Sequence, residues 1–405
     1  MKALLVALND HYSDELWNLN LEELNSLCDA CHLDVTRVIT QKAEPTKAYF
    51  IGKGKVEEVK LALDDEEVVV FNEELTPLQI RNLSDALGVE VIDRTDLILH
   101  IFNERAKTNE ARLQVTIARL NYELPRLAGM NQAIYSQQGG SGFRGAGEKE
   151  IELNRRRIRN QITKAKRQLE QLKKVRQTQR KNRQHEKVVA LVGYTNAGKS
   201  SLLNYFSDKK VFEEDMLFAT LETSTRQVVL KNNKRILMSD TVGFISNLPH
   251  HLVEAFQSTL EEVTEADLIV QVIDGSSPQA KHQMEVTREV IERLGASHVP
   301  MIYAYNKIDR GVPDLTIPEE PHVFMSVKEG TGIAMLEDLM ISMLFQDEEH
   351  VDLLIPYAEG DAYSKITSLA TVRDESFLDD GIALSIDVSP KYRKIYEQYR
   401  REKQK

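Results

Sequence analysis

The strongest constraint on how this 405-residue chain can fold is one glycine-containing string in its middle. It lies between an apolar, β-branched run at 188–192 and a second apolar run at 202–206, and it reads Gly193-Tyr194-Thr195-Asn196-Ala197-Gly198-Lys199-Ser200. This is the pattern G-x-x-x-x-G-K-[ST] in the strand-to-helix setting that a phosphate-binding loop requires. The glycines let backbone N–H groups surround phosphate oxygens, and the helix N-terminus adds a partial positive charge. The string therefore predicts a nucleotide site in an α/β domain.

Residue roles within this loop follow from phosphate chemistry. Lys199 is predicted to pair with the β- and γ-phosphates, and the Ser200 hydroxyl is predicted to ligate Mg²⁺. Asn196 occupies the loop position where several cation-dependent GTPases place a K⁺-coordinating asparagine, so potassium is a second candidate cofactor by analogy. The predicted nucleotide contacts of the loop are Gly193, Tyr194, Thr195, Asn196, Ala197, Gly198, Lys199, Ser200 and Ser201.

Three further strings follow in order, each after an apolar strand-like run. Asp240-Thr241-Val242-Gly243 supplies a carboxylate for the Mg²⁺ shell, acting through water, and a glycine N–H for the γ-phosphate. In Asn306-Lys307-Ile308-Asp309 the aspartate, expected to be buried, accepts hydrogen bonds from guanine N1–H and the exocyclic amine, a donor pair that adenine lacks. Ser326-Val327-Lys328 resembles the loop that supports guanine O6. Four such pieces in order predict a Mg²⁺-dependent protein that binds GTP and GDP and hydrolyses GTP.

The rest of the chain divides around this site. Strand and helix patterns alternate over residues 1–101, which predicts a parallel sheet with helices packed against it. We expect a helical hairpin arm at 102–186, the GTPase domain at 187–348 and a small α+β domain at 349–405, closed by a helix at 389–403. The predicted fold class is therefore α/β, with a parallel-sheet domain, a long antiparallel hairpin and a P-loop domain.

The arm is predicted from two apolar stripes with helical spacing. Its first helix carries Phe102, Ala106, Leu113, Ile117, Leu120 and Leu124 and is expected to end near Pro125; its second carries Ile151, Ile158, Ile162, Ala165, Leu169 and Leu172. A tip loop is expected at 137–147, where five of the nine residues from Gly139 onward are glycine. Such a segment does not fold alone, which favours a probe that orders on a partner over a plain linker.

Charge is concentrated on the second helix of the arm. Residues 154–187 hold 14 Lys or Arg and two acidic residues, a net charge of +12, so the remaining residues must carry −23 to reach the total of −11. One basic element on an acidic protein suits nucleic acid, although a solvated helix face is an equal alternative. The candidate RNA-binding residues are Gly139, Gly140, Gly142, Arg144, Gly145, Gly147, Arg155, Arg156, Arg157 and Arg159.

Several strings resemble one family, the HflX family of translational GTPases. They are Arg81-Asn82-Leu83, Val91-Ile92-Asp93-Arg94-Thr95, Ile101-Phe102-Asn103-Glu104-Arg105-Ala106, Gln114-Val115, Leu124-Pro125-Arg126-Leu127, and the glycine loop running on to Gly147-Glu148 and Arg155-Arg156. Phe218-Ala219-Thr220-Leu221, followed by Glu222, resembles the family's switch I. The resemblance covers about residues 1–350. This chain has Gly145-Ala146-Gly147-Glu148-Lys149-Glu150-Ile151-Glu152 where the family reads Gly-Pro-Gly-Glu-Thr-Gln-Leu-Glu, and Glu222-Thr223 where it reads Asp-Pro.

The resemblance implies more than the residues alone show. It implies that Thr220 is a second Mg²⁺ ligand, which makes Lys199, Thr220 and Gly243 the candidate catalytic residues. It implies a ribosome partner, chiefly the large subunit and its ribosomal RNA, and a role in splitting or rescuing ribosomes under stress. Two alternatives stay open: a signalling switch with a protein effector, and an NTP-driven RNA remodeller with a second anion site at Gly52-Lys53-Gly54-Lys55.

Other features exclude further classes of protein. No apolar run approaches 18 residues and the start is too short for a signal peptide, so we expect a cytoplasmic protein. We also expect it to be a monomer. Cys28, Cys31 and His32 nominally match a haem-attachment string, but they fall in an expected helix, and no further metal ligands follow nearby. We interpret both thiols as buried or half-buried core groups.

Overall fold

The structure is a computed structural model that describes residues 1–10, 12–137, 144–181, 186–207, 218, 224–246, 252, 262–311 and 321–401. For residues 128–137, 144–151 and 176–181 it describes the backbone alone. The chain forms two compact units. The first comprises Met1–Thr178, Glu214–Glu222 and Gly243–Thr259, and the second comprises Gln179–Glu213, Thr223–Val242 and Leu260–Lys405. No helix among the described residues is long and apolar enough to cross a membrane.

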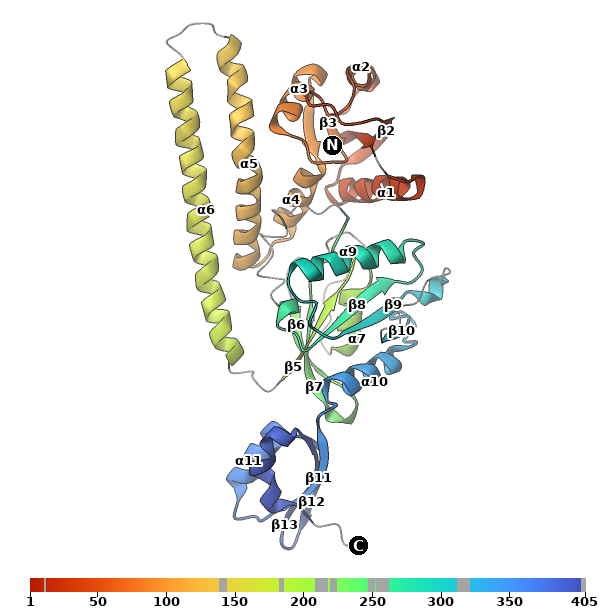
Figure 1. Ribbon diagram of the computed structural model, residues 1–405, viewed down its shortest axis with the longest axis vertical. Helices are drawn as coiled ribbons and strands as arrows, with labels where there is room; N and C mark the ends of the chain where they lie inside the picture. Colours follow the sequence, from red (N-terminus) through yellow and green to blue (C-terminus); the bar gives the residue numbers. More distant parts are fainter. Residues whose placement is uncertain are drawn as a thin grey trace. The chain divides into compact units, whose positions relative to one another are not determined.

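The N-terminal domain is a four-stranded parallel sheet in the order β2-β1-β3-β4 (Figure 1). Its strands are β1 (Lys2–Asn9), β2 (Asp34–Lys42), β3 (Val68–Phe71) and β4 (Glu90–Asp93). Its helices are α1 (Asp14–Ala30), α2 (Lys53–Ala62), α3 (Pro77–Leu87) and α4 (Arg94–Arg105). All three strand pairs are parallel, and β3 is buried along its whole length, as expected for a sheet covered on both faces. The α/β architecture predicted from the alternating pattern is confirmed.

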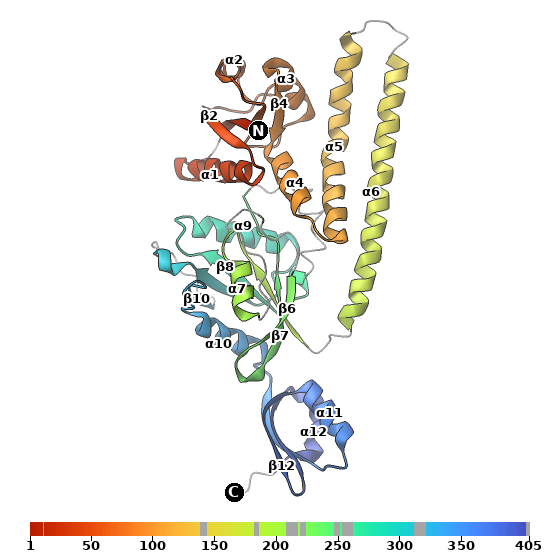
Figure 2. The same ribbon diagram turned by 180° about the vertical axis from the view of Figure 1, so that it is seen from behind.

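The arm consists of α5 (Asn109–Gln137) and α6 (Arg144–Lys181), which run side by side in both views (Figures 1 and 2). Along α6 the predicted apolar stripe is the less exposed face, and Ala165 on it is buried. The expectation that Pro125 ends the first helix is wrong, because Pro125 lies inside α5. The helix continues because the turn around the proline is held by Arg126, which bonds to the carbonyl oxygens of Tyr122 and Leu75.

The tip of the arm also differs from the expected loop. Helix α6 begins at Arg144, so residues 144–147 have helical backbone rather than belonging to the loop. Ala146, Glu148 and Lys149 are good helix formers and extend the helix past its two glycines. Of the predicted tip residues, Gly139, Gly140 and Gly142 lie outside the described residues.

The P-loop domain has a six-stranded sheet in the order β10-β9-β8-β5-β7-β6, in which only the β6–β7 pair is antiparallel. Its strands are β5 (Lys187–Val192), β6 (Ser224–Val229), β7 (Arg235–Asp240), β8 (Leu268–Asp274), β9 (Met301–Asn306) and β10 (His322–Phe324). Its helices are α7 (Lys199–Phe206), α9 (Ala280–Arg293) and α10 (Ile333–Leu344), with short η1 (Lys231–Asn233) and η2 (Ile308–Arg310). Parallel strands place their carboxyl ends at one edge, where a ligand is expected.

The C-terminal domain is an antiparallel sheet in the order β11-β13-β12. Its elements are β11 (Glu349–Ile355), α11 (Gly360–Leu369), β12 (Thr371–Leu378), β13 (Gly381–Val388), η3 (Pro390–Tyr392), α12 (Arg393–Tyr396) and η4 (Glu397–Tyr399). The single closing helix expected at 389–403 is wrong. Its residues form three short turns because Tyr396 and Tyr399 enter the core and Arg400 then pairs with Leu353.

A buried ion pair joins the P-loop domain to this C-terminal sheet. Lys234, between β6 and β7, is 4% exposed and lies 2.9 Å from the Asp387 carboxylate. Asp387 also accepts hydrogen bonds from Arg373 Nε (2.8 Å) and interacts with His350 Nδ1 (3.1 Å). Although burial opposes its charge, the hydrogen bonds from Lys234, Arg373 and His350 lower the pKa of Asp387. The C-terminal domain is thus fixed to the hairpin that leads into Asp240.

This pair predicts a pH-dependent stability. Asp387→Asn should lower the free energy of unfolding at pH 7 by about 2 kcal/mol, because the buried Lys234 loses one of its two carboxylate partners and keeps Glu348. Since the folded pKa of Asp387 lies below the unfolded value of about 3.9, its contribution is present above that pH and is lost as the pH falls through the folded pKa. Urea denaturation at pH 7 and at about pH 3.5 measures both effects.

A matched control is Asp338→Asn, which removes an exposed partner of Lys231 and should cost less than about 1 kcal/mol. A difference between Asp387→Asn and the parent that does not change with pH would contradict the assignment of the effect to this carboxylate.

Candidate functional site

The phosphate-binding loop is held so tightly that two of its positions have no room for a side chain. At Gly193, where φ is 149°, an added Cβ would lie 2.1 Å from the carbonyl oxygen of Val272 on β8. At Gly198, where φ is 99°, it would lie 2.2 Å from Nδ2 of Asn306. Both positions therefore require glycine, for close approach as well as for backbone angle. The loop backbone packs directly on the ends of β8 and β9.

Lys199 lies across this loop. Its side chain is buried, and Nζ donates to the carbonyl oxygens of Gly193 (3.1 Å) and Tyr194 (2.9 Å). Burial lowers the pKa of Lys199 to about 8, and the charge of Asp240 works in the opposite direction. A positive group pre-positioned inside the loop is suited to pairing with phosphate oxygens, whose charge offsets the cost of burying it.

Ser200 and Asp240 come together at the adjoining edge of the sheet. The Ser200 hydroxyl donates to Asp240 Oδ2 at 2.6 Å, and Asp240 is fully buried at the end of β7. The next residue, Thr241, donates from its hydroxyl to the Leu191 carbonyl oxygen (2.8 Å) and so ties the string to β5. In the part of the chain that the structure describes, no three His, Cys, Asp or Glu side chains gather as a metal site. A hydroxyl and one carboxylate fit Mg²⁺, which takes few protein ligands and keeps water and phosphate oxygens.

Asn306 links the phosphate loop to the two base-recognition strings. Its Nδ2 donates to the Ala197 carbonyl oxygen at 2.9 Å, and its Oδ1 accepts from the Val327 N–H at 3.0 Å. Lys307 follows in a left-handed conformation (φ 65°) and pairs with Asp274 at 2.8 Å. The predicted site residues did not include Asp274, although a carboxylate at the end of a buried strand, here the last residue of β8, is the signal that marks it.

Asp309 differs from expectation in one respect. Its carboxylate accepts a hydrogen bond from the Ser326 hydroxyl (2.7 Å), which lowers the pKa of Asp309. Asp309 itself is exposed, so the expectation of a buried carboxylate at this position is wrong. It lies in the short η2 turn after the end of β9, and its hydrogen-bond donor Ser326 is buried. The oxygens of Asp309 are therefore open to a base that arrives from solvent.

The remaining predicted contacts lie in two other places. Ser326, Val327 and Lys328 form the turn after β10, where Ser326 is buried. Gly243 is described, but it groups with the N-terminal unit, as does Phe218. Of the other predicted switch residues, Ala219, Thr220, Leu221 and Glu222 lie outside the described residues.

The strand–loop–helix of β5 and α7, with an Asp at the end of β7 and Asn-Lys-x-Asp at the end of β9, defines a P-loop GTPase. Family models agree: residues 188–307 match "50S ribosome-binding GTPase", residues 18–103 match "GTP-binding GTPase N-terminal", and residues 105–183 match "GTP-binding GTPase Middle Region". The chain contains these three family regions in order.

Two curated relatives narrow the family. The chain is 42% identical over 393 residues to GTPase HflX of Caldanaerobacter subterraneus subsp. tengcongensis, covering 96% of this chain and 91% of that protein. It is 40% identical over 369 residues to GTPase HflX of Lacrimispora saccharolytica, covering 89% and 87%. The chain belongs to the HflX family of GTPases, and it is a GTP hydrolase.

The contacts of Asp309 predict that a substitution at this residue changes which nucleotide the protein prefers. Asp309→Asn should weaken GTP binding by about a hundredfold or more and favour xanthosine triphosphate, because xanthine presents a carbonyl where guanine presents an amine. Equilibrium binding of fluorescent GTP and XTP analogues measures the exchange. Asp274→Asn is the control, since it removes a carboxylate that pairs with Lys307 without reversing the preference between the bases. Parent-like GTP binding by Asp309→Asn would show that this loop does not select the base.

Proposed function

We propose that this protein is a ribosome-associated GTPase that binds the large subunit through its arm and splits or rescues ribosomes under stress in a GTP-dependent way. The observation that carries the proposal is the combination, in one chain, of a GTPase domain matching a ribosome-binding family model and a hairpin whose second helix is strongly basic. Full-length similarity to HflX proteins supports it.

In the proposed reaction the backbone of residues 193–201 surrounds the phosphates and Lys199 neutralises charge on the β- and γ-phosphates. Ser200, Thr220 and, through water, Asp240 would hold Mg²⁺, which supplies charge stabilisation at the transferred phosphoryl group. The Gly243 N–H would contact the γ-phosphate. Asp309 and the turn at 326–328 would fix the guanine base, so the phosphates sit in one register for attack by water.

The residue after Gly243 explains why hydrolysis should be slow without a partner. Ras-type enzymes carry there a glutamine that orients the attacking water. Phe244 has no hydrogen-bonding side-chain atom and is buried, so it does not perform that task. Since groups supplied by a partner accelerate GTPases by about 10³–10⁵, the ribosome is the proposed source of the acceleration.

The arm offers the RNA surface. On α6, Arg156, Arg157 and Arg159 are exposed, and a groove on this helix is lined by Leu153, Arg156, Arg157, Asn160, Gln161 and Lys164. Guanidinium groups spaced along a rigid helix suit phosphate contacts, and the tip segment 139–147 would reach ribosomal RNA beyond them. The same charge would make binding sensitive to salt, because each neutralised phosphate releases counterions.

This surface predicts a change in salt dependence. Replacing Arg156, Arg157 and Arg159 by Gln should weaken binding to purified large subunits, and the slope of log affinity against log salt should fall by about 2–3. A GTPase titration with large subunits at several salt concentrations should show the same loss of stimulation, with basal GTP binding retained.

The matched control replaces Lys281, Arg288 and Arg293 on α9 by Gln, which removes equal charge from the P-loop domain. If the α6 and α9 variants lose the same affinity, net charge rather than the arm accounts for binding. If neither the parent nor any variant sediments with ribosomal subunits, the signalling alternative takes its place.

Asn196 predicts a dependence on potassium. Its backbone is left-handed, with φ at 60°, in the loop between the two required glycines. If its side chain helps to hold K⁺ beside the phosphates, hydrolysis in K⁺ buffer should exceed hydrolysis in Na⁺ buffer of equal ionic strength by about tenfold. Asn196→Ala should abolish the difference. Equal rates for the parent in both salts would rule out the potassium site.

A further inference from the structure

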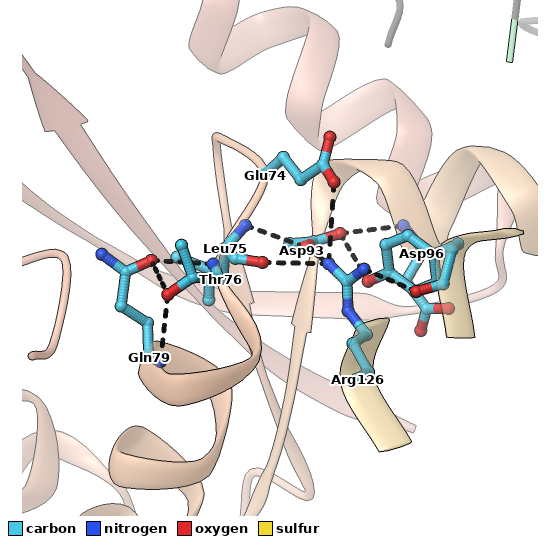
Figure 3. Close-up of polar contacts among 8 residues, drawn as sticks. Glu74, Leu75, Thr76, Gln79, Asp93, Asp96 and Arg126 are labelled. Atoms are coloured by element: carbon cyan, nitrogen blue, oxygen red, sulfur yellow. Dashed lines mark hydrogen bonds and ion pairs between the residues drawn. The ribbon is translucent and has the colours of Figure 1, made fainter. Parts of the chain in front are cut away.

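The carboxylate of Asp93 joins the N-terminal sheet to the arm. Asp93 ends β4, is fully buried and accepts four hydrogen bonds (Figure 3). Two come from one face of α5, the Tyr122 hydroxyl at 2.9 Å and the Arg126 guanidinium at 3.0 Å. The N–H groups of Leu75 (2.9 Å) and Asp96 (3.0 Å) supply the others. Because a buried charge that loses its donors is strongly disfavoured, a displacement of this turn of α5 acts directly on Asp93.

Further charged and aromatic groups lie around Asp93. Arg126 also donates to the Leu75 carbonyl oxygen at 2.9 Å, and its guanidinium lies 3.3 Å from the centroid of the Tyr122 ring. Asp96 shares the site: burial, and then the nearby charge of Asp93, raise the pKa of Asp96 to about 6. Residues 118–127 of α5, which we call the base of the arm, and the start of α4 therefore share one polar cluster around Asp93.

Arg94, the residue after Asp93, contacts the segment that follows Gly243. Arg94 is the first residue of α4, and Asp93 caps that helix. The Arg94 side chain is 3% exposed, pairs with Glu23 of α1 at 3.1 Å, and donates from Nη2 to the carbonyl oxygen of Ser246 at 2.9 Å. Ser246 follows Asp240 by six residues in the chain and belongs to the same compact unit as Arg94. Adjacent residues thus contact the arm on one side and the segment after Gly243 on the other.

Helix α4 also contacts a second segment of the GTPase domain's sequence, the predicted switch I. Phe102, two turns after Arg94, meets Phe218 edge to face, with ring centroids 4.7 Å apart and an interplanar angle of 79°. Phe218 is 1% exposed and has φ of 55°, a conformation that a bulky residue adopts only when its surroundings hold it. Phe218 precedes Thr220 by two residues, so α4 contacts both segments that would respond to the γ-phosphate.

We propose that Arg94 is a positioning residue for GTP hydrolysis, which holds the segment after Gly243 and passes displacement of the arm, felt at Asp93, to that segment. The proposal rests on the proposed function, in which the large subunit acts on the arm. If Arg94 links the two segments, a nucleotide that orders the segment after Gly243 also orders the base of the arm. The amide protection of that base should therefore differ between the GDP and GTP states when no ribosome is present.

The first test uses hydrogen exchange on the full chain without ribosomes. In the parent, replacing GDP by a non-hydrolysable GTP analogue should change the exchange of amides 118–127 by about tenfold, within the usual range of coupling. The double variant Arg94→Met/Glu23→Gln, which leaves no unpaired buried charge, should lose that change while β8 and β9 stay protected. Arg119→Met is the control, because it removes an exposed arginine of α5, the helix whose amides are measured.

The second test separates this proposal from the proposed function. If large subunits do not stimulate the parent, the proposed function fails. If they stimulate the parent, the stimulation ratio of the double variant should fall at least about tenfold at subunit concentrations that saturate its binding. Equal stimulation, with the nucleotide-dependent exchange of 118–127 intact, would overturn the role of Arg94.

A conservative variant covers the case in which the double variant does not fold. Arg94→Lys keeps the charge, but it replaces the fixed, planar guanidinium, whose Nη2 contacts both Glu23 and Ser246, with a strongly hydrated ammonium on a flexible stem. It should fold and show an intermediate stimulation ratio. Parent-like coupling in Arg94→Lys, by both exchange and stimulation, would also overturn the proposal.

Discussion

The close approach of the phosphate loop to the ends of β8 and β9 is the constraint on which the nucleotide site depends. At Gly193 and Gly198 the backbone leaves no space for a Cβ, so the loop lies directly on Val272 and Asn306. That contact fixes Asn306, which in turn bonds to the loop and to Val327. The residues that bind phosphate and those that bind guanine therefore pack against one edge of the sheet. A substitution at Gly193 or Gly198 would displace both sets of residues.

The contact between the arm and the segment after Gly243 depends on two residues at the start of α4. Asp93 ties the arm to the N-terminal sheet, and Arg94 ties that sheet to Ser246. Since Asp93 and Arg94 are adjacent in the chain, we propose that the base of the arm and the segment after Gly243 rearrange together. This chain has Phe244 where Ras-type GTPases have a glutamine that orients the attacking water. A partner that stimulates hydrolysis would therefore act on the site through contacts such as those of Asp93 and Arg94. The basic face of α6 offers a surface for that partner.

The sequence predicted what depends on local pattern, and it missed what depends on contacts distant in the chain. The strand–loop–helix around Lys199, the parallel N-terminal sheet and the second arm helix follow from glycine placement and apolar periodicity. The first arm helix was predicted to carry Phe102 and Ala106, which is wrong: Phe102 lies in α4, Ala106 caps the end of α4, and α5 begins at Asn109. Pro125 was misplaced because Arg126 holds its turn through Asp93, 33 residues away. The exposure of Asp309 and the broken helix after Ser389 likewise depend on which neighbours fill the core. The ribosomal partner came from resemblance, since a +12 segment specifies charge and no particular RNA.

The central claim is that the bound nucleotide changes the protein's affinity for the large ribosomal subunit. The most direct measurement is the dissociation constant of the full-length protein for purified large subunits, with GDP and with a non-hydrolysable GTP analogue at one fixed salt concentration. The account predicts binding tighter by about 10–100-fold with the analogue, and an equal factor for the effect of subunits on the affinity for the analogue relative to GDP. Equal affinities in the two nucleotide states would contradict it.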